Sequence, residues 1–167
     1  MDFTTLEYYS QFLPIALIAV FVLGYRNKNM QISLLLISSY AFFWFASGWH
    51  VILLLISTLV DWNVSNKINS TNEISTKKRW LTLSMVINLG LLGIFKYLDF
   101  IIESLNWATL KIGGSPSIEA MGLILPVGIS FYTFQTMSYT IDIYRDKYKP
   151  YDNFTSFACY AAFFPQL

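Results

Sequence analysis

The sequence predicts an all-α fold: a polytopic transmembrane helical bundle with about five spans, an interfacial amphipathic helix and the start of a further helix. Of the 167 residues, 55% are hydrophobic and only 13% are charged, whereas soluble domains carry about 25% charged residues. Long apolar runs alternate with short polar or basic breaks along the whole chain. A helix needs about 20 mostly apolar residues to cross a bilayer, with roughly 17 tolerated.

The first three apolar runs cover residues 8–25, 32–45 and 49–62. A short basic stretch separates the first two, and Ser47-Gly48 predicts a tight turn between the second and third. The second and third runs are short for full crossings. Because aromatic residues flank them and such residues sit in the headgroup layer, we expect both to be spans.

The second half of the chain begins with a polar stretch, residues 63–79, which we expect to be an extramembrane loop. Residues 80–97 form the fourth apolar run, and residues 121–144 form the fifth. Between them, residues 98–110 place apolar and polar side chains on opposite faces of a helix, a pattern typical of interfacial helices. Residues 154–167 predict the beginning of another apolar helix.

The basic residues predict the orientation of these spans. With an extracytoplasmic N-terminus, the loops after spans one, three and five face the cytoplasm, and only two basic residues lie outside. That bias follows the positive-inside rule and favours this orientation. The predicted cytoplasmic residues are Arg26, Lys28, Lys67, Lys77, Lys78, Arg79, Arg145, Lys147 and Lys149, and the outside ones are Lys96 and Lys111.

Several function classes lack support in the sequence. The net charge of +1 gives no electrostatic reason to expect nucleic acid as a partner. There is no phosphate-binding loop, no CxxC and no HExxH, so neither a bound cofactor nor a metal site is predicted. The single histidine, His50, follows Trp49 at the end of the third run, and we interpret it as an interfacial side chain.

The fifth run carries the most informative polar residues. Gln135, Ser138, Tyr139 and Asp142 are spaced i, i+3, i+4 and i+7, so they share one face of a helix. A polar stripe in a membrane helix faces protein or water, not lipid. Interhelical hydrogen bonding and lining of a substrate cavity both explain this stripe.

Four other residues extend this set. Lys96 and Tyr97 end the fourth run, where the lysine either snorkels to headgroups or lines a cavity for an anionic donor or polymer. We therefore include both as substrate-tunnel candidates, together with Gln135, Ser138 and Tyr139. Asp61 is expected to reach water near the cytoplasmic end of its span, and Asp142 and Arg145 to pair with each other, all in structural roles.

Several motifs resemble those of one known family. Residues 125–145, LPVGISFYTFQTMSYTIDIYR, look like the signature of the membrane-bound O-acyltransferases, most closely the alginate O-acetyltransferase branch. The teichoic-acid D-alanyl transfer protein is a relative of that branch. STLVDW at residues 57–62, NLGLLGIFKY at 88–97 and FFPQL at 163–167 resemble further segments of it. The resemblance covers nearly the whole chain in the same order.

This resemblance implies a bacterial inner-membrane enzyme that moves an acetyl or acyl group onto hydroxyls of an extracytoplasmic polysaccharide such as alginate. The donor would be acyl-CoA or another acyl thioester, and periplasmic or membrane acyl-relay proteins would be partners. In the family an intramembrane histidine acts as general base, since an imidazole can take the hydroxyl's proton during attack on the acyl carbonyl. We expect residues 1–167 to be the N-terminal part of one such domain, in a truncated chain, with that histidine beyond Leu167. No residue here is assigned as catalytic.

Two other interpretations stay open at this point. A truncated, non-catalytic membrane protein could act as a scaffold or hold a partner. A small permease would show paired broken helices or internal symmetry, and the sequence shows neither.

Overall fold

The computed structural model describes residues 10, 12–23, 25, 27–115, 119, 121–122 and 126–166. All regular secondary structure in these residues is helical, which confirms the all-α prediction. Pro116, Leu125, Arg26 and the start of the first apolar run lie outside the described residues. The elements are α1 (Leu13–Ile18), η2 (Ala19–Leu23), α2 (Lys28–Ser47), η3 (Gly48–His50), α3 (Val51–Asn69), α4 (Ile74–Lys111), α5 (Ile129–Tyr144), α6 (Phe154–Ala161) and η4 (Phe164–Gln166).

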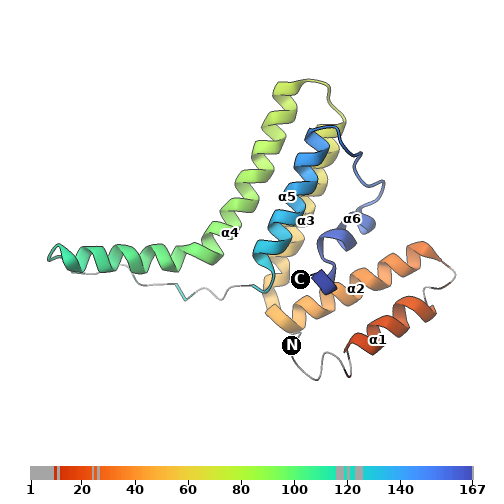
Figure 1. Cartoon of the computed structure of the whole chain (residues 1–167), viewed down its shortest axis with the longest axis horizontal. Helices are drawn as coiled ribbons and strands as arrows, with labels where there is room; N and C mark the ends of the chain where they lie inside the picture. The colour runs from red at the N-terminus through yellow and green to blue at the C-terminus, as the bar shows by residue number, and fades with distance from the viewer. Residues whose placement is uncertain are drawn as a thin grey trace.

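The centre of the molecule is a bundle of α3, the first part of α4, and α5, which run side by side in Figure 1. Apolar side chains from these helices and from α2 form one buried cluster. Its members include Phe43, Leu54, Leu92, Ile129 and Tyr132. The three helices therefore share a core and hold one another's polar side chains in fixed positions.

Helix α2 begins at an asparagine cap, because the Asn27 side chain accepts hydrogen bonds from the backbone N–H groups of Asn29 and Met30. It ends at Gly48, whose φ of 60° lies in a region that side-chain-bearing residues rarely adopt. The chain then turns into α3, so the predicted helices over 32–45 and 49–62 and the break between them are confirmed. Figure 1 shows α2 running at a steep angle to α3.

Two helical stretches of the described residues are long and apolar enough to cross a membrane. They are Lys28–Asn69, which contains α2 and α3, and Ile74–Lys111, which is α4. These stretches are consistent with the predicted membrane protein. They do not confirm the finer prediction of five spans.

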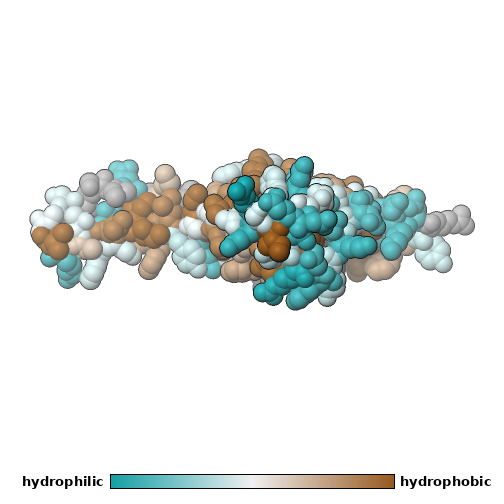
Figure 2. All heavy atoms as spheres, turned by 90° about the horizontal axis from the view of Figure 1, so that it is seen from above, coloured by the Kyte–Doolittle hydropathy of each residue, from teal (hydrophilic) through white to brown (hydrophobic). Residues whose placement is uncertain are grey.

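Helix α4 joins two elements that the sequence analysis separates, the span over 80–97 and the amphipathic helix over 98–110. Its 38 residues form one helix, about 57 Å long at 1.5 Å per residue. Figure 1 shows it bending, so that its second part leaves the bundle as an arm. On that arm Phe100 and Trp107 are 67% and 64% exposed, and Figure 2 shows hydrophobic side chains along it.

The prediction of a loop over residues 63–79 is wrong. Helix α3 continues to Asn69, and α4 already begins at Ile74, so only four residues connect them. Val64 and Ile68 explain the longer helix, because they bury against Ile143 of α5 and extend the packed face of α3. The polar side chains of this stretch include Asn63, which donates to the Leu59 carbonyl one turn earlier in the same helix.

The last apolar run forms a shorter helix than predicted, and the described residues 12–23 of the first run are helical. The first contains α1, followed by a wider π-helical turn, η2, and ends at Leu23 within the described residues. The prediction of a continuous helix over 154–167 is wrong, because α6 ends at Ala161 and the chain turns into η4. A continued α-helix would need the backbone N–H of residue 165 to bond to the Ala161 carbonyl, and proline has no N–H. Residue 167 lies outside the described part.

Contacts of the segments that connect the helices show which helix ends lie together in the bundle. The Lys77 ammonium pairs with the Asp146 carboxylate at 2.9 Å, so the start of α4 and the end of α5 meet. At the opposite end, the Val127 N–H donates to Ser47 Oγ at 3.0 Å. Seen from above in Figure 2, hydrophilic side chains gather over the middle of the molecule. The connection before α4 and the one after α5 therefore lie at one end of the bundle, and the connections before α3 and before α5 lie at the other.

We predict that Gly48→Ala lowers the free energy of unfolding by about 1–3 kcal/mol, because a Cβ is strained at positive φ. No neighbouring atom lies within 4 Å of that Cβ position, so backbone strain is the only cause. Gly90→Ala is the matched control, since Gly90 lies inside α4 in equally open space and alanine favours helix there. Denaturant titration in detergent measures both, and equal stability of the two variants would contradict the prediction.

Candidate functional site

The polar side chains at the centre of the bundle form a connected network that joins three helices. Asn88 of α4 donates through Nδ2 to both carboxylate oxygens of Asp61 of α3, each at 2.9 Å. Ser84 Oγ of α4 donates to the same carboxylate, and Ser57 Oγ donates to Asn88 Oδ1. Thr136 of α5 adds a hydroxyl beside the Asp61 carboxylate. We call these five residues the polar knot.

The polar knot corrects one sequence-based expectation. Asp61 is 0% exposed and therefore does not reach water at the end of its span. Its partners are also fully or almost fully buried. The spacing explains why: Ser57 and Asp61 lie one turn apart on α3, and Ser84 and Asn88 lie one turn apart on α4. Asp61 holds helices together, which is a structural role of the kind predicted.

Helix α5 has two polar faces, and only one of them was predicted. Thr133, Thr136 and Thr140 are buried on the face that packs against α3 and α4, together with Ile129 and Met137. The predicted stripe lies on another side of α5. There Gln135 and Tyr139 are half-buried and Ser138 is exposed. The stripe therefore points away from the centre of the described bundle.

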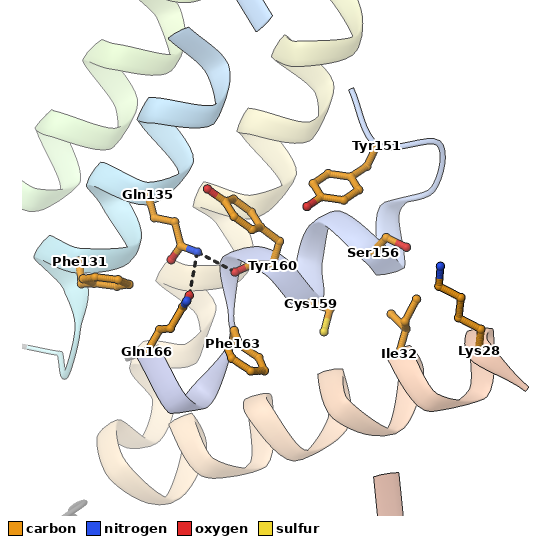
Figure 3. A pocket seen from close by; sticks show the side chains of 10 residues that line it. All are labelled: Lys28, Ile32, Phe131, Gln135, Tyr151, Ser156, Cys159, Tyr160, Phe163 and Gln166. Atoms are coloured by element: carbon orange, nitrogen blue, oxygen red, sulfur yellow. Dashed lines mark hydrogen bonds between the residues drawn. The ribbon is translucent and has the colours of Figure 1, made fainter. Parts of the chain in front are cut away.

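A hollow of about 700 Å³ lies beside the stripe, between α2, α5 and α6 (Figure 3). Gln135 crosses from α5 toward its wall, where Nε2 donates to the Tyr160 carbonyl at 3.0 Å and to Gln166 Oε1 at 3.3 Å. Aromatic side chains and a few polar groups make up the rest of the lining. They include Phe131, Tyr151, Phe163, Ser156 and Lys28.

Two more hollows continue along the same side of α5. One of about 570 Å³ is bordered by Ser130, Gln135 and Ser138, and another of about 470 Å³ by Ser138, Tyr139 and Asp142. Tyr160 borders all three hollows. The four residues of the stripe thus border neighbouring hollows that share lining residues. Occupation of these spaces by a substrate stays a prediction.

Lys96 and Tyr97 lie near the other end of the stripe. The Lys96 ammonium donates to Ser130 Oγ of α5 at 3.1 Å and sits 5.5 Å from the centre of the Tyr97 ring. Ser130 also borders one of the hollows, so Lys96 reaches that hollow's edge through a hydrogen bond. Tyr97 is 47% exposed. The structure places Lys96 beside the start of α5, with Tyr97 next to it, and assigns neither a ligand.

The expected ion pair between Asp142 and Arg145 is wrong. Asp142 pairs instead with Lys147, at 3.0 Å. The end of α5 explains the difference: Asp146 adopts φ 55°, and the Lys147 N–H returns to the Asp142 carbonyl at 3.0 Å. This turn carries the Lys147 side chain back beside Asp142 and leaves Arg145 exposed.

His50 is buried, not interfacial as expected. Its Nδ1 lies 2.7 Å from the Ser47 carbonyl oxygen, and its ring stacks on Trp49 with centroids 4.2 Å apart. No acidic side chain orients the ring among the described contacts of this histidine. It anchors the turn between α2 and α3.

The members of the polar knot on α4 and α5 were missed in the sequence analysis. Ser84 and Asn88 are small or medium polar residues within an apolar run, and single residues of this kind give little signal. Their one-turn spacing, matched by Ser57 and Asp61, was the available indication. Finding the network from sequence requires knowing that α3 and α4 face each other at this level.

Sequence comparison shows which known proteins this chain is similar to. The chain is 37% identical over its whole length to a probable alginate O-acetylase of Pseudomonas syringae, and 36% identical to one of Pseudomonas aeruginosa. A peptidoglycan O-acetyltransferase of Helicobacter pylori is 33% identical over 86% of the chain. No family model and no solved structure matches the chain significantly.

The chain is therefore similar to O-acetylases and O-acetyltransferases, in agreement with the membrane-bound O-acyltransferase resemblance of its motifs. It spans about a third of the length of these relatives, 32% for the two Pseudomonas proteins and 27% for the Helicobacter protein. The family resemblance of the motif at residues 125–145 is thereby confirmed. Most of that motif is α5, the helix that carries both the threonine face and the stripe.

Proposed function

We propose that these residues form the N-terminal scaffold part of a membrane O-acyltransferase that moves an acetyl or acyl group onto hydroxyls of an extracytoplasmic polysaccharide. The observation that carries the proposal is the match over the whole chain to alginate O-acetylases. The relatives' names give two polymers, alginate and peptidoglycan. Alginate is the proposed acceptor because probable alginate O-acetylases match the whole chain at up to 37% identity.

The hollows along α5 support a contribution to the substrate path. An acyltransferase must keep water away from its activated acyl group, so its site needs spaces enclosed by protein. The hollows are open on one side in the described residues; Gln135, Ser138 and Tyr139 bring amide and hydroxyl groups to them, and Lys96 brings a cation near one end. The proposed donor is acyl-CoA or another acyl thioester, and acyl-relay proteins of the periplasm or membrane are proposed partners.

We propose the following topology in the bacterial inner membrane. The N-terminus is extracytoplasmic, five helices span the bilayer, and the arm of α4 lies in the interface. The contact between Lys77 and Asp146 supports it, because two predicted cytoplasmic connections meet there. The arm's exposed aromatic side chains and the Lys111 ammonium, 5.5 Å from the Trp107 ring centre, suit a headgroup environment.

The second candidate function is a non-catalytic membrane scaffold or partner protein. His50 is the only histidine of the sequence, and it is buried with Nδ1 against a backbone carbonyl. These 167 residues therefore contain no imidazole placed to activate a hydroxyl. Acetylation that is lost on deletion of the gene, and restored only by a copy that also encodes an intramembrane histidine, separates the first candidate from the second.

We predict that a chromosomal Gln135→Ala allele lowers polysaccharide acetylation roughly tenfold, which corresponds to about 1.4 kcal/mol of activation free energy. The variant removes the amide that faces the hollows. Base-released acetate from purified polymer is the measurement, with protein abundance in the membrane followed in parallel. Ser104→Ala on the exposed arm, where the hydroxyl bonds only to the Phe100 carbonyl, is the control. Unchanged acetylation at normal abundance would count against cavity lining.

We predict opposite labelling of two cysteine variants in intact spheroplasts. A membrane-impermeant maleimide should modify Lys111→Cys without lysis and Lys78→Cys only after lysis, because the proposed topology places these exposed residues on opposite sides. The native Cys159 is buried, and the parent chain measures its background. The reverse labelling pattern would show that the chain is inserted the other way.

A further inference from the structure

The polar knot contains a carboxyl group with no cationic partner among the described residues. The groups that contact Asp61 are Ser84, Asn88 and Thr136, and all three are neutral. The described salt bridges of the chain involve other acidic residues, Asp142 and Asp146. An ionised carboxylate without a counter-charge is so costly in an apolar interior that such groups are neutralised instead.

The elements packed around Asp61 offer no charged group at its level. On α3, the residues one turn away, Ser57, Thr58 and Ser65, are neutral and buried. Helix α6 also packs on α3 and contains no acidic or basic residue, its ionisable groups being Cys159 and Tyr160. On α5, the acidic residue is Asp142, near the helix end and paired with Lys147. On α4, Lys96 lies two turns beyond Asn88 and bonds to Ser130.

The contacts of the polar knot can be met by a neutral acid. Ser84 Oγ and Asn88 Nδ2 both donate to Asp61 Oδ1, whereas Oδ2 accepts from Asn88 alone among the described hydrogen bonds. Oδ2 therefore has room for a proton, and the neighbouring Thr136 hydroxyl is a group that can accept as well as donate.

We propose that Asp61 is a proton-binding site and is a neutral carboxylic acid in the folded protein at neutral pH. Its carboxyl accepts from Asn88 and Ser84 and lies beside the Thr136 hydroxyl, so it links α3 to both neighbouring helices. The knot thus holds three membrane helices together without placing a charge between them. This proposal concerns the fold of the bundle and does not rest on the proposed acyltransferase function.

Infrared spectroscopy of the protein in lipid nanodiscs at pH 7 tests the proposal. A protonated acid has a carbonyl stretching band that is distinct from the bands of a carboxylate and of the amide backbone. We expect this band in the native chain, a shift of it when aspartate is labelled with ¹³C at the carboxyl carbon, and its loss in Asp61→Asn. Asp152→Asn, at an exposed position, is the matched control and should keep the band.

The native chain alone decides the outcome if Asp61→Asn fails to fold, because Asp61 is the buried acidic residue of the described part. A labelled acid band in the native chain then supports the proposal. A spectrum with carboxylate bands only, from protein whose circular dichroism shows the full helical content, would overturn it. Retention of the band in a folded Asp61→Asn variant would overturn it as well.

Discussion

The contact between Asp61 and Asn88 is the interaction on which the rest of this structure depends. It lies where α3 and α4 face each other, and Thr136 extends it to α5. Apolar packing between membrane helices gives little preference for one register, because lipid tails are as apolar as the side chains. A buried polar contact has a partner at only one register. The polar knot therefore fixes how α5 is rotated and which of its faces meets the hollows.

That rotation is what connects the fold to the proposed function. With its threonine face turned into the bundle, α5 directs Gln135, Ser138 and Tyr139 toward the spaces beside α6. One turn of helix contains both Thr136, which packs into the polar knot, and Gln135 and Ser138, which border the hollows. The motif at residues 125–145 contains both faces, since most of it is α5.

The sequence was informative for features that depend on one helix alone. Gly48 indicated the break between α2 and α3, and the spacing of Gln135 and Ser138 indicated a shared polar face. It was less informative for features that depend on how distant parts of the chain pack against each other. The buried state of Asp61 depends on Asn88, which is 27 residues away, and the pairing of Asp142 with Lys147 depends on a turn at Asp146. The polar residues 63–69 looked like a loop because the buried partner of Val64 and Ile68, on α5, is distant in sequence.

A double-mutant cycle between Asp61 and Asn88 tests the central claim most directly. The free energy of unfolding is measured in detergent for the native chain, Asp61→Ala, Asn88→Ala and the double variant. If the two side chains hold α3 and α4 in register, the second substitution should cost little once the first is made, with a coupling energy of about 1–3 kcal/mol. Additive effects, with no coupling between the two positions, would contradict the claim that this contact organises the bundle.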